Sequence, residues 1–259
     1  MKLSSMLLAC MVAAGGLAEP TLKVGFMTDT HVDRRPASAD RVRMAFEVFK
    51  ANGAEVVVHC GDLADRHYPE AYGHYRKAIE DVYKDGAKRP ELYYVRANHD
   101  AINHDFGKGN QERFMDFNKA FEGFDKGLGV THPMMVEKKI KGVQFLILPQ
   151  SWSLVGGMKV VADAIDRLCA ENPGRPVVVC SHIPLKNTVQ GSERWGLNFG
   201  GVFSKHPQVI LFTGHSHGTL PGTAASTDVG VDCFDFRPVT LEEIRVRLAE
   251  NALAEGGEP

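Results

Sequence analysis

The chain has 259 residues, of which 44% are hydrophobic and 24% charged, the length and composition of an ordinary globular protein with a full core. Its formal net charge is −2, and no basic run stands out. This argues against a surface that neutralises many phosphates of a duplex, so we expect no nucleic-acid polymer as a partner.

The first 18 residues have the pattern of a secretory signal peptide. Lys2 supplies one positive charge, a short apolar stretch follows, and the small residues Gly16 and Ala18 suit cleavage after Ala18. No later segment is long and apolar enough to span a bilayer, so we expect no stable membrane insertion. The prediction is a periplasmic or secreted protein; the alternative is a lipoprotein anchored through Cys10.

Residues 19–259 are expected to form a single domain in which short apolar strands alternate with amphipathic helices. The predicted strands are 22–27, 56–58, 92–95, 143–148, 177–179 and 209–212. Helical spacing of apolar residues predicts helices over 42–49, 72–82 and 161–168, and a capping box of Thr240 and Glu243 predicts the start of a last helix. This order favours an α/β layered fold.

Two segments are expected to be irregular. Residues 101–135 are rich in glycine and charge, which predicts an excursion over one edge of the fold, and the residues after Ala249 are expected to fray.

Five of the predicted strands are followed by aspartate, asparagine or histidine. The first is followed by the sequence TDTHVD, in which Asp29 and His31 are two residues apart and would share one face of an extended strand. A single Asp-x-His is more simply interpreted as a polar turn. Five such strand ends indicate a site, because ligands of α/β sheets bind at the carboxyl ends of the strands.

The residue types at these strand ends indicate metal ions. Carboxylates, an amide oxygen and imidazoles without a thiolate suit Mn, Fe, Zn or Ni better than an all-oxygen calcium or magnesium site. Seven such groups exceed what one ion needs, and two ions roughly 3.5–4 Å apart can share a carboxylate and hold a water between them.

In their types and order, the five motifs resemble those of the calcineurin-like metallophosphoesterases. The motifs are Asp-x-His at 29–31, Gly-Asp-x-x-Asp at 61–65, Asn-His-Asp at 98–100, His182 and Gly-His-x-His at 214–217. The resemblance extends from Leu22 to about Leu248 and implies a four-layer α/β/β/α metallophosphoesterase sandwich with two metal ions.

The resemblance also implies a role for each motif residue. One ion would be bound by Asp29, His31 and His217, and the other by Asn98, His182 and His215. Asp62 would bridge both ions. His99, held by Asp100, would stand near the leaving oxygen of the substrate as a proton donor or charge stabiliser.

Some positions depart from branches of the family. The third motif usually begins with glycine, where this chain has Ala97, so the turn must accept a Cβ atom. Purple acid phosphatases have Tyr at the position of Asp65 and Gly at that of His31, which disfavours that branch. Protein Ser/Thr phosphatases share Arg66 but have Gly in place of His67.

Each remaining candidate residue outside the motifs has two interpretations, a functional one and an ordinary structural one. Arg66 could contact phosphate, although a surface arginine is the simpler interpretation, and Trp195 could stack on a base or sugar or else pack in the core. His59 is expected to be an ordinary strand residue, and Cys60 a buried thiol.

Within the family, the Asp-x-His opening and the small size most resemble bacterial phosphodiesterases of the cyclic-nucleotide and glycerophosphodiester type. This resemblance implies hydrolysis of a small phosphodiester by a metal-bridging hydroxide. Few cations near the motifs, namely Arg66 and Lys186, favour the singly charged diester over the doubly charged monoester. The alternatives are a phosphomonoesterase of the same fold and a non-catalytic metal-binding scaffold.

Overall fold

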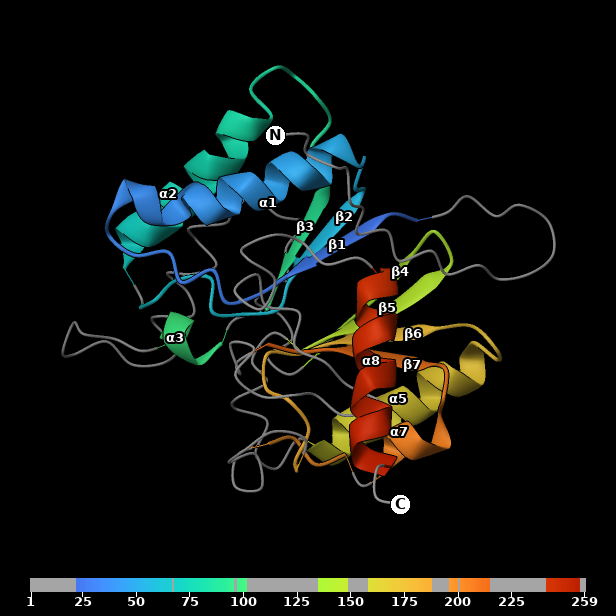
Figure 1. The fold of residues 1–259 in the computed structure, drawn as a ribbon. Helices are drawn as coiled ribbons and strands as arrows, with labels where there is room; N and C mark the ends of the chain where they lie inside the picture. The colour runs from blue at the N-terminus through green and yellow to red at the C-terminus, as the bar shows by residue number, and fades with distance from the viewer. Residues whose placement is uncertain are drawn as a thin grey trace.

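Two sheets form the centre of the molecule, and each has helices on its outer face (Figure 1). The computed structural model describes residues 22–66, 68–95, 97–101, 135–148, 158–187, 196–199, 201–214 and 241–256. The predicted signal peptide, and all but the ends of the 101–135 segment, lie outside the described residues.

Among the described residues, the first sheet contains three parallel strands in the order β1-β2-β3. They are β1 (Val24–Met27), β2 (Val56–His59) and β3 (Glu91–Tyr94). Every residue of β1 and β2 is buried, as expected of parallel strands that are covered on both faces. The register pairs Val24 with Val56 and Val56 with Glu91, so these strands end at one edge.

The helices α1 (Asp40–Ala51) and α2 (Pro69–Val82) cover the outer face of this sheet, and the short η1 (Pro36–Ala39) precedes α1. The predicted apolar face of α1 is buried, and Gly53 follows the helix with φ +65°. Both helices match the prediction within a few residues, because helical spacing of apolar residues is a strong local signal.

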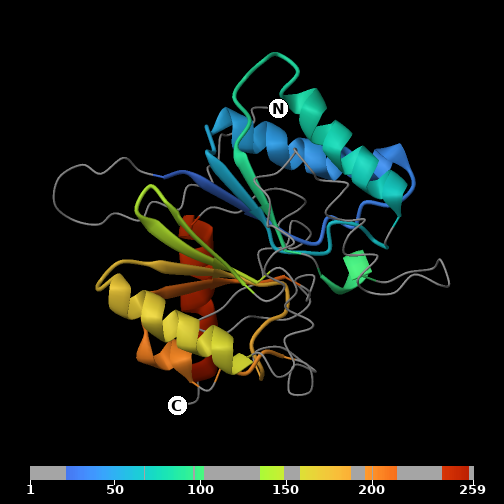
Figure 2. The same cartoon turned by 180° about the vertical axis from the view of Figure 1, so that it is seen from behind.

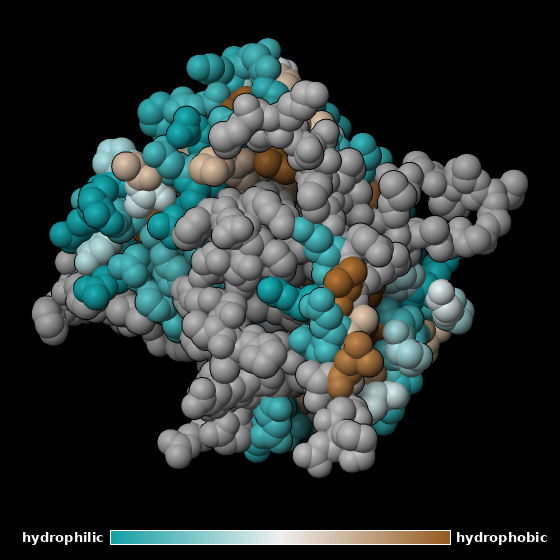
Figure 3. Space-filling model, viewed as in Figure 1, coloured by the Kyte–Doolittle hydropathy of each residue, from teal (hydrophilic) through white to brown (hydrophobic). Residues whose placement is uncertain are grey.

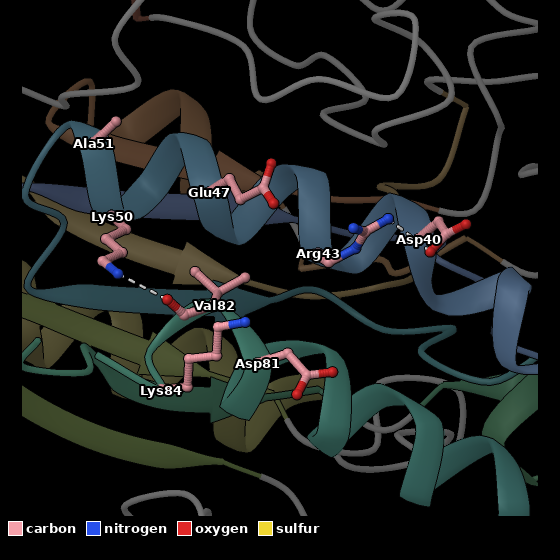
Figure 4. A pocket seen from close by; sticks show the side chains of 8 residues that line it. All are labelled: Asp40, Arg43, Glu47, Lys50, Ala51, Asp81, Val82 and Lys84. Carbon is pink, nitrogen blue, oxygen red and sulfur yellow. Dashed lines mark hydrogen bonds and ion pairs between the residues drawn. The ribbon is translucent and has the colours of Figure 1, made fainter. Parts of the chain in front are cut away.

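Lys50 joins the ends of these two helices, since its Nζ donates to the Val82 carbonyl at 2.8 Å and to Asp85 at 2.6 Å. Figure 4 shows Lys50 reaching across a groove of about 800 Å³ between the helices. The other residues that line the groove are mostly charged, and Arg43 and Asp40 pair with each other along one wall.

In the part of the chain that the structure describes, the second sheet has four strands in the order β4-β5-β6-β7. They are β4 (Val136–Ile140), β5 (Val143–Ile147), β6 (Val177–Cys180) and β7 (Val209–Phe212). β4 and β5 form an antiparallel hairpin, whereas β5, β6 and β7 are parallel. The sequence did not predict β4, because its alternating exposure marks an edge strand with few apolar residues.

α5 (Met158–Glu171) and α7 (Val202–Lys205) lie on the outer face of the second sheet (Figure 2). Leu146, Val179 and Leu211 point to this layer and belong to the same apolar cluster as Val161 and Ile165 of α5.

The inner faces of the two sheets pack against each other. Phe26 of β1 stacks on Phe212 of β7 with ring centroids 3.7 Å apart. On the other face of β1, a Cβ atom at Gly25 would lie 2.6 Å from the Phe49 ring of α1, so glycine allows the helix to approach closely. The order helix, sheet, sheet, helix confirms the predicted α/β/β/α sandwich (Figures 1 and 2).

The last helix, α8 (Leu241–Gly256), is longer than expected. The prediction that the chain frays after Ala249 is wrong, because Asn251 is buried and the helix continues to Gly256. Leu248 packs against the main core, whereas Val246 and Leu253 are 50% and 77% exposed and hydrophobic surface appears over α8 in Figure 3. Within the described segments, no helix has both the length and the apolar character needed to cross a membrane.

Candidate metal centre

Three fully buried side chains meet beyond the carboxyl ends of β1, β2 and β6: Asp29, Asp62 and His182. The His182 Nε2 atom lies 3.2 Å from Asp62 Oδ2. His31 lies beside them, with Nε2 3.7 Å from Asp29 Oδ1 and 3.9 Å from Asp62 Oδ2. The three side chains follow three separate strands and converge at one place. Buried charged side chains need a partner of opposite charge, so this place suits a cation.

Asp62 belongs to two groups of possible ligands. One group contains Asp29, Asp62 and His182, the other His31, Asp62 and His99, and within each group the ligand atoms lie within 4.8 Å of one another. A carboxylate that belongs to both groups has the position that a ligand bridging two ions needs. The expected division of the other ligands between two ions stays a prediction.

Asp29, His31 and Asp62 all have left-handed backbone conformations, with φ of 55°, 43° and 51°. The expectation that Asp29 and His31 share one face of a strand is therefore wrong, since β1 ends at Met27 and both residues lie in the following loop. Strained backbone of this kind persists only where neighbouring structure holds it.

Backbone hydrogen bonds between the first two motifs provide that support. The N–H groups of Asp29, His31 and Val32 donate to the carbonyls of residues 61, 62 and 63 at 2.9, 3.1 and 2.9 Å. The two loops thus run side by side, and this pairing brings Asp29 and His31 close to Asp62.

The third motif adds Asn98 and His99 at the start of α3 (Asn98–Ala101). The His99 N–H donates to Asp62 Oδ1 at 2.9 Å, which places this turn against the shared carboxylate. Among the described residues, Asn98 Oδ1 is buried and has no hydrogen-bond partner. A buried acceptor without a donor costs free energy, and a cation at this position would satisfy it.

The electrostatics of the cluster favour a cation. Burial alone would lower the pKa of His182, but the Asp62 and Asp29 carboxylates outweigh it and raise that pKa to about 10. For Asp62, burial raises the pKa, but the charge and hydrogen bond of His182, together with the charge of His99, leave that pKa below its ordinary value. Without a metal, a proton on His182 balances the carboxylates; a metal ion would displace this proton. The residues thus fit a divalent cation in both geometry and charge.

His99 is held differently from the prediction. Its Nδ1–H donates to the Asp65 carbonyl at 2.7 Å, not to Asp100, and its ring packs edge-on against that of His31 with centroids 4.6 Å apart. The side chain is 33% exposed, so Nε2 can face a substrate from solvent. The geometry allows Nε2 either to donate a proton or to bind an ion, and the assignment as proton donor stays a prediction.

Asp100 instead holds the backbone of the site together. Its buried carboxylate accepts from the N–H groups of Ala97, Ala64 and Leu63 at 3.0, 2.9 and 3.4 Å. Ala97 fits at the position where glycine was expected because its Cβ atom packs against Gly61, where a second Cβ would come within 2.6 Å.

Comparison with known proteins agrees with this geometry. The family model described as calcineurin-like phosphoesterase matches residues 22–219, well over half of the chain. The chain belongs to the calcineurin-like phosphoesterases. It is therefore a metal-dependent phosphoester hydrolase of a family that uses dimetal centres.

Solved structures share the fold of this phosphoesterase at low sequence identity. A dimetal phosphatase from Danio rerio has a TM-score of 0.56 and 14% identity, over 79% of this chain and 84% of that one. A purple acid phosphatase from seeds of yellow lupin (Lupinus luteus) has a TM-score of 0.53 and 14% identity, over 75% of this chain and 37% of that one. Among curated proteins, no sequence matches the chain.

The fifth motif of the phosphoesterase begins at the centre. A side chain on Gly214 would overlap the Thr28 hydroxyl and the Asp29 carboxylate, and the Gly214 N–H donates to the His182 carbonyl at 3.1 Å. His215 and His217 follow directly but lie outside the described residues, as does Trp195.

Two further expectations concern neighbours of the second motif. Cys60 is a buried free thiol, as predicted, and its carbonyl accepts from His182 Nδ1 at 3.0 Å. Arg66 is exposed, with Nε 3.7 Å from the Asp65 carboxylate, so its position is that of a surface residue beside the site.

Sequence reasoning missed a pocket beside His31. It has a volume of about 520 Å³ and is lined by Asp33, Arg35, Ala37, Ser38 and Arg41 as well as by His31 and Asp65. The signal was the arginine-rich stretch directly after the first motif, whose placement depends on the turn through η1.

Proposed function

We propose that this phosphoesterase hydrolyses a small phosphodiester, of the cyclic-nucleotide or glycerophosphodiester type, at a centre with two metal ions. The observation that carries the proposal is the Asp62 carboxylate, shared by two groups of ligand atoms. We further propose that the protein acts in the periplasm or is secreted, after cleavage of residues 1–18.

The residues that would hold the ions are Asp29, His31, Asp62, Asn98 and His182, together with His215 and His217. When bound, the two ions supply an activated water and neutralise the phosphoryl oxygens. The carbonyl of Cys60 orients His182 through Nδ1, which turns Nε2 toward Asp62. His99, oriented by the Asp65 carbonyl, would protonate the leaving oxygen through Nε2.

The pocket beside His31 supports a substrate with a second substituent on phosphorus. Its volume would accommodate a sugar or a glycerol group next to the ions. Arg35 pairs with Asp33, and this guanidinium lowers the pKa of Asp33 to about 2, so the pair adds no net charge. The other charged residues of the pocket, Arg41 and Asp65, have opposite signs, and a nearly neutral wall suits the singly charged diester.

A phosphomonoesterase is the second candidate. Arg41 lines the pocket beside His31, and it could hold the second negative charge of a monoester. Both similar structures are of phosphatases, which is compatible with this candidate. A scaffold without activity disagrees with membership of a family of metal-dependent hydrolases, and His99, the expected proton donor, is present.

The deciding experiment compares bis(p-nitrophenyl) phosphate with p-nitrophenyl phosphate, with the same metal and pH, after elemental analysis of the protein. We expect about two ions per chain and a higher kcat/KM for the diester. A tenfold or greater preference for the monoester would refute the diester proposal while leaving the metal-dependent hydrolysis intact.

A matched pair of variants tests the pocket. Arg41→Gln removes a cation that lines the pocket, whereas Arg43→Gln removes a cation from the same helix that faces the groove of Figure 4. We expect Arg41→Gln to change KM by several-fold for substrates with a charged substituent, and Arg43→Gln to leave KM unchanged. Equal KM values for both variants would show that substrate does not occupy this pocket.

A further inference from the structure

His59 is a buried polar residue that has no place among the metal ligands. It is the last residue of β2, fully buried, and stands three positions before Asp62. We propose that His59 is a positioning residue, whose imidazole sets the distance between the loop that carries Asp29 and His31 and the loop that carries Asp62. The proposal rests on the metal-dependent activity of the family and not on the diester preference.

Both ring nitrogens of His59 have partners, and the partners determine which nitrogen carries the proton. The Gly61 N–H donates to Nδ1 at 3.2 Å, so Nδ1 is an acceptor and the proton is on Nε2. Nε2–H then donates to Thr30 Oγ1 at 3.1 Å, and the Thr30 hydroxyl donates to the Leu63 carbonyl at 2.9 Å. The three hydrogen bonds run in one direction without a conflict.

These partners are the neighbours of the proposed ligands. Thr30 lies between Asp29 and His31, and Gly61 and Leu63 flank Asp62. The imidazole therefore ties together the two loops whose ligands must be a fixed distance apart to share ions. Partners of this kind, one step removed from the metal, tune metal affinity by holding the ligands in place.

The backbone of the ligands explains why such a tie is needed. Asp29, His31 and Asp62 each have positive φ, a conformation that costs of order 1–3 kcal/mol per residue and must be imposed by the surroundings. The backbone hydrogen bonds between the two loops hold the main chain of the ligand residues. The hydrogen bonds of His59 to Gly61 and Thr30, which we call the His59 relay, hold the residues next to those ligands.

The packing around the ring gives it a single orientation. The Tyr75 ring packs edge-on against His59 with centroids 5.7 Å apart, and Tyr94 lies at 6.4 Å on the neighbouring strand. A ring enclosed in this way cannot turn over without losing both hydrogen bonds.

The test measures the affinity of the chelator-treated full-length protein for Mn²⁺ by isothermal titration calorimetry. His59→Phe keeps the ring and removes both hydrogen bonds, and we expect a roughly 10–100-fold weaker affinity, the range found for such outer partners. His59→Gln keeps a donor toward Thr30 and should recover part of the affinity. At saturating Mn²⁺, the KM for bis(p-nitrophenyl) phosphate should be unchanged in both variants.

Variants of Thr30 test the same hydrogen bonds independently of His59. Thr30→Val removes the hydroxyl at nearly constant volume and should weaken Mn²⁺ binding, whereas Thr30→Ser keeps the hydroxyl and should not. If His59→Phe fails to fold, the Thr30 pair decides the matter. In a double-mutant cycle, the effects of His59→Phe and Thr30→Val should be less than additive, because both break one relay.

Nitrogen-15 NMR of the labelled protein provides a readout that does not depend on activity. We expect the His59 ring to show a protonated Nε2 and an unprotonated Nδ1, and a protonated Nδ1 would overturn the proposal. Wild-type affinity in a folded His59→Phe or Thr30→Val variant would also overturn it. A wild-type protein that bound no Mn²⁺ and hydrolysed no ester would instead overturn the metal assignment, and this proposal with it.

Discussion

Replacing Asp100 with alanine is expected to destabilise the fold as well as the active site. The buried carboxylate accepts hydrogen bonds from three backbone N–H groups, at 2.9, 3.0 and 3.4 Å, which join the second motif to the third. Removing the acceptor leaves these donors buried without a partner. This mechanism differs from loss of a side chain that only orients His99.

The magnitude follows from the number of donors left without a partner. Each buried donor that loses its acceptor costs about 1–3 kcal/mol, and the bond of 3.4 Å is too long to contribute much. Two good hydrogen bonds are lost, and water that enters the space replaces part of them. The free energy of unfolding should therefore fall by about 3 kcal/mol. For a domain of this size, 1 kcal/mol corresponds to about 2–4 °C, so the Tm should fall by about 6–12 °C.

The assay is thermal unfolding with a chelator present, so that bound metal does not contribute to stability. Asp100→Asn keeps one acceptor oxygen and should lose about half as much as Asp100→Ala. Asp81→Ala is the matched control, because Asp81 is exposed on α2 and pairs only with Lys77 among the described residues. An Asp100→Ala protein with the wild-type Tm but a large loss of kcat would refute the reasoning and favour a purely catalytic role.

Three further outcomes are expected. Asp62→Asn should lower the metal content from about two ions per chain to one or none by elemental analysis, since it weakens the shared ligand; unchanged content would contradict bridging. His99→Ala should keep its metal and lose roughly 10²–10⁴-fold in kcat, with a smaller loss for nitrophenyl leaving groups than for alkyl ones; equal losses would exclude protonation of the leaving group. Burial lowers the pKa of His59 from 6.5 to about 3, so below pH 6.5 the unfolded chain binds a proton that the folded chain does not. Stability of the metal-free protein should therefore fall by about 2 kcal/mol between pH 6.5 and 5, measured by urea unfolding, and His59→Phe should reduce this slope. The raised pKa of His182 acts in a different window, because its stabilisation is complete below pH 6.5 and is lost as the pH rises toward about 10.

The order of the motifs and the main strands were predictable from local sequence. Apolar runs such as Val56–His59 are buried on both faces of a parallel sheet, which gives a strong signal within a few residues. The strand β4 and the last turns of α8 were not predictable, because they are held by the neighbouring strand and by the buried Asn251 and not by a local pattern.

The candidate ligands were also identified from sequence, but the reason given for one pair was wrong. Asp29 and His31 meet through a loop with positive φ that Gly61, Asp62 and Leu63 hold from another part of the chain. Local spacing suggested a strand face, and spacing alone contains no information about that second loop.

The sequence by itself determined the kinds of atoms that the site offers, since carboxylate, amide and imidazole groups follow directly from residue types at strand ends. Only the tertiary structure decided which partners each group has: Asp100 serves the backbone of two motifs, Asp65 orients His99, and His59 joins the two ligand loops. The residues that these contacts connect are 36, 34 and 29 positions apart in the sequence. Hydrogen bonding requires a distance near 3 Å and a set direction, and only the packing of the whole chain fixes both.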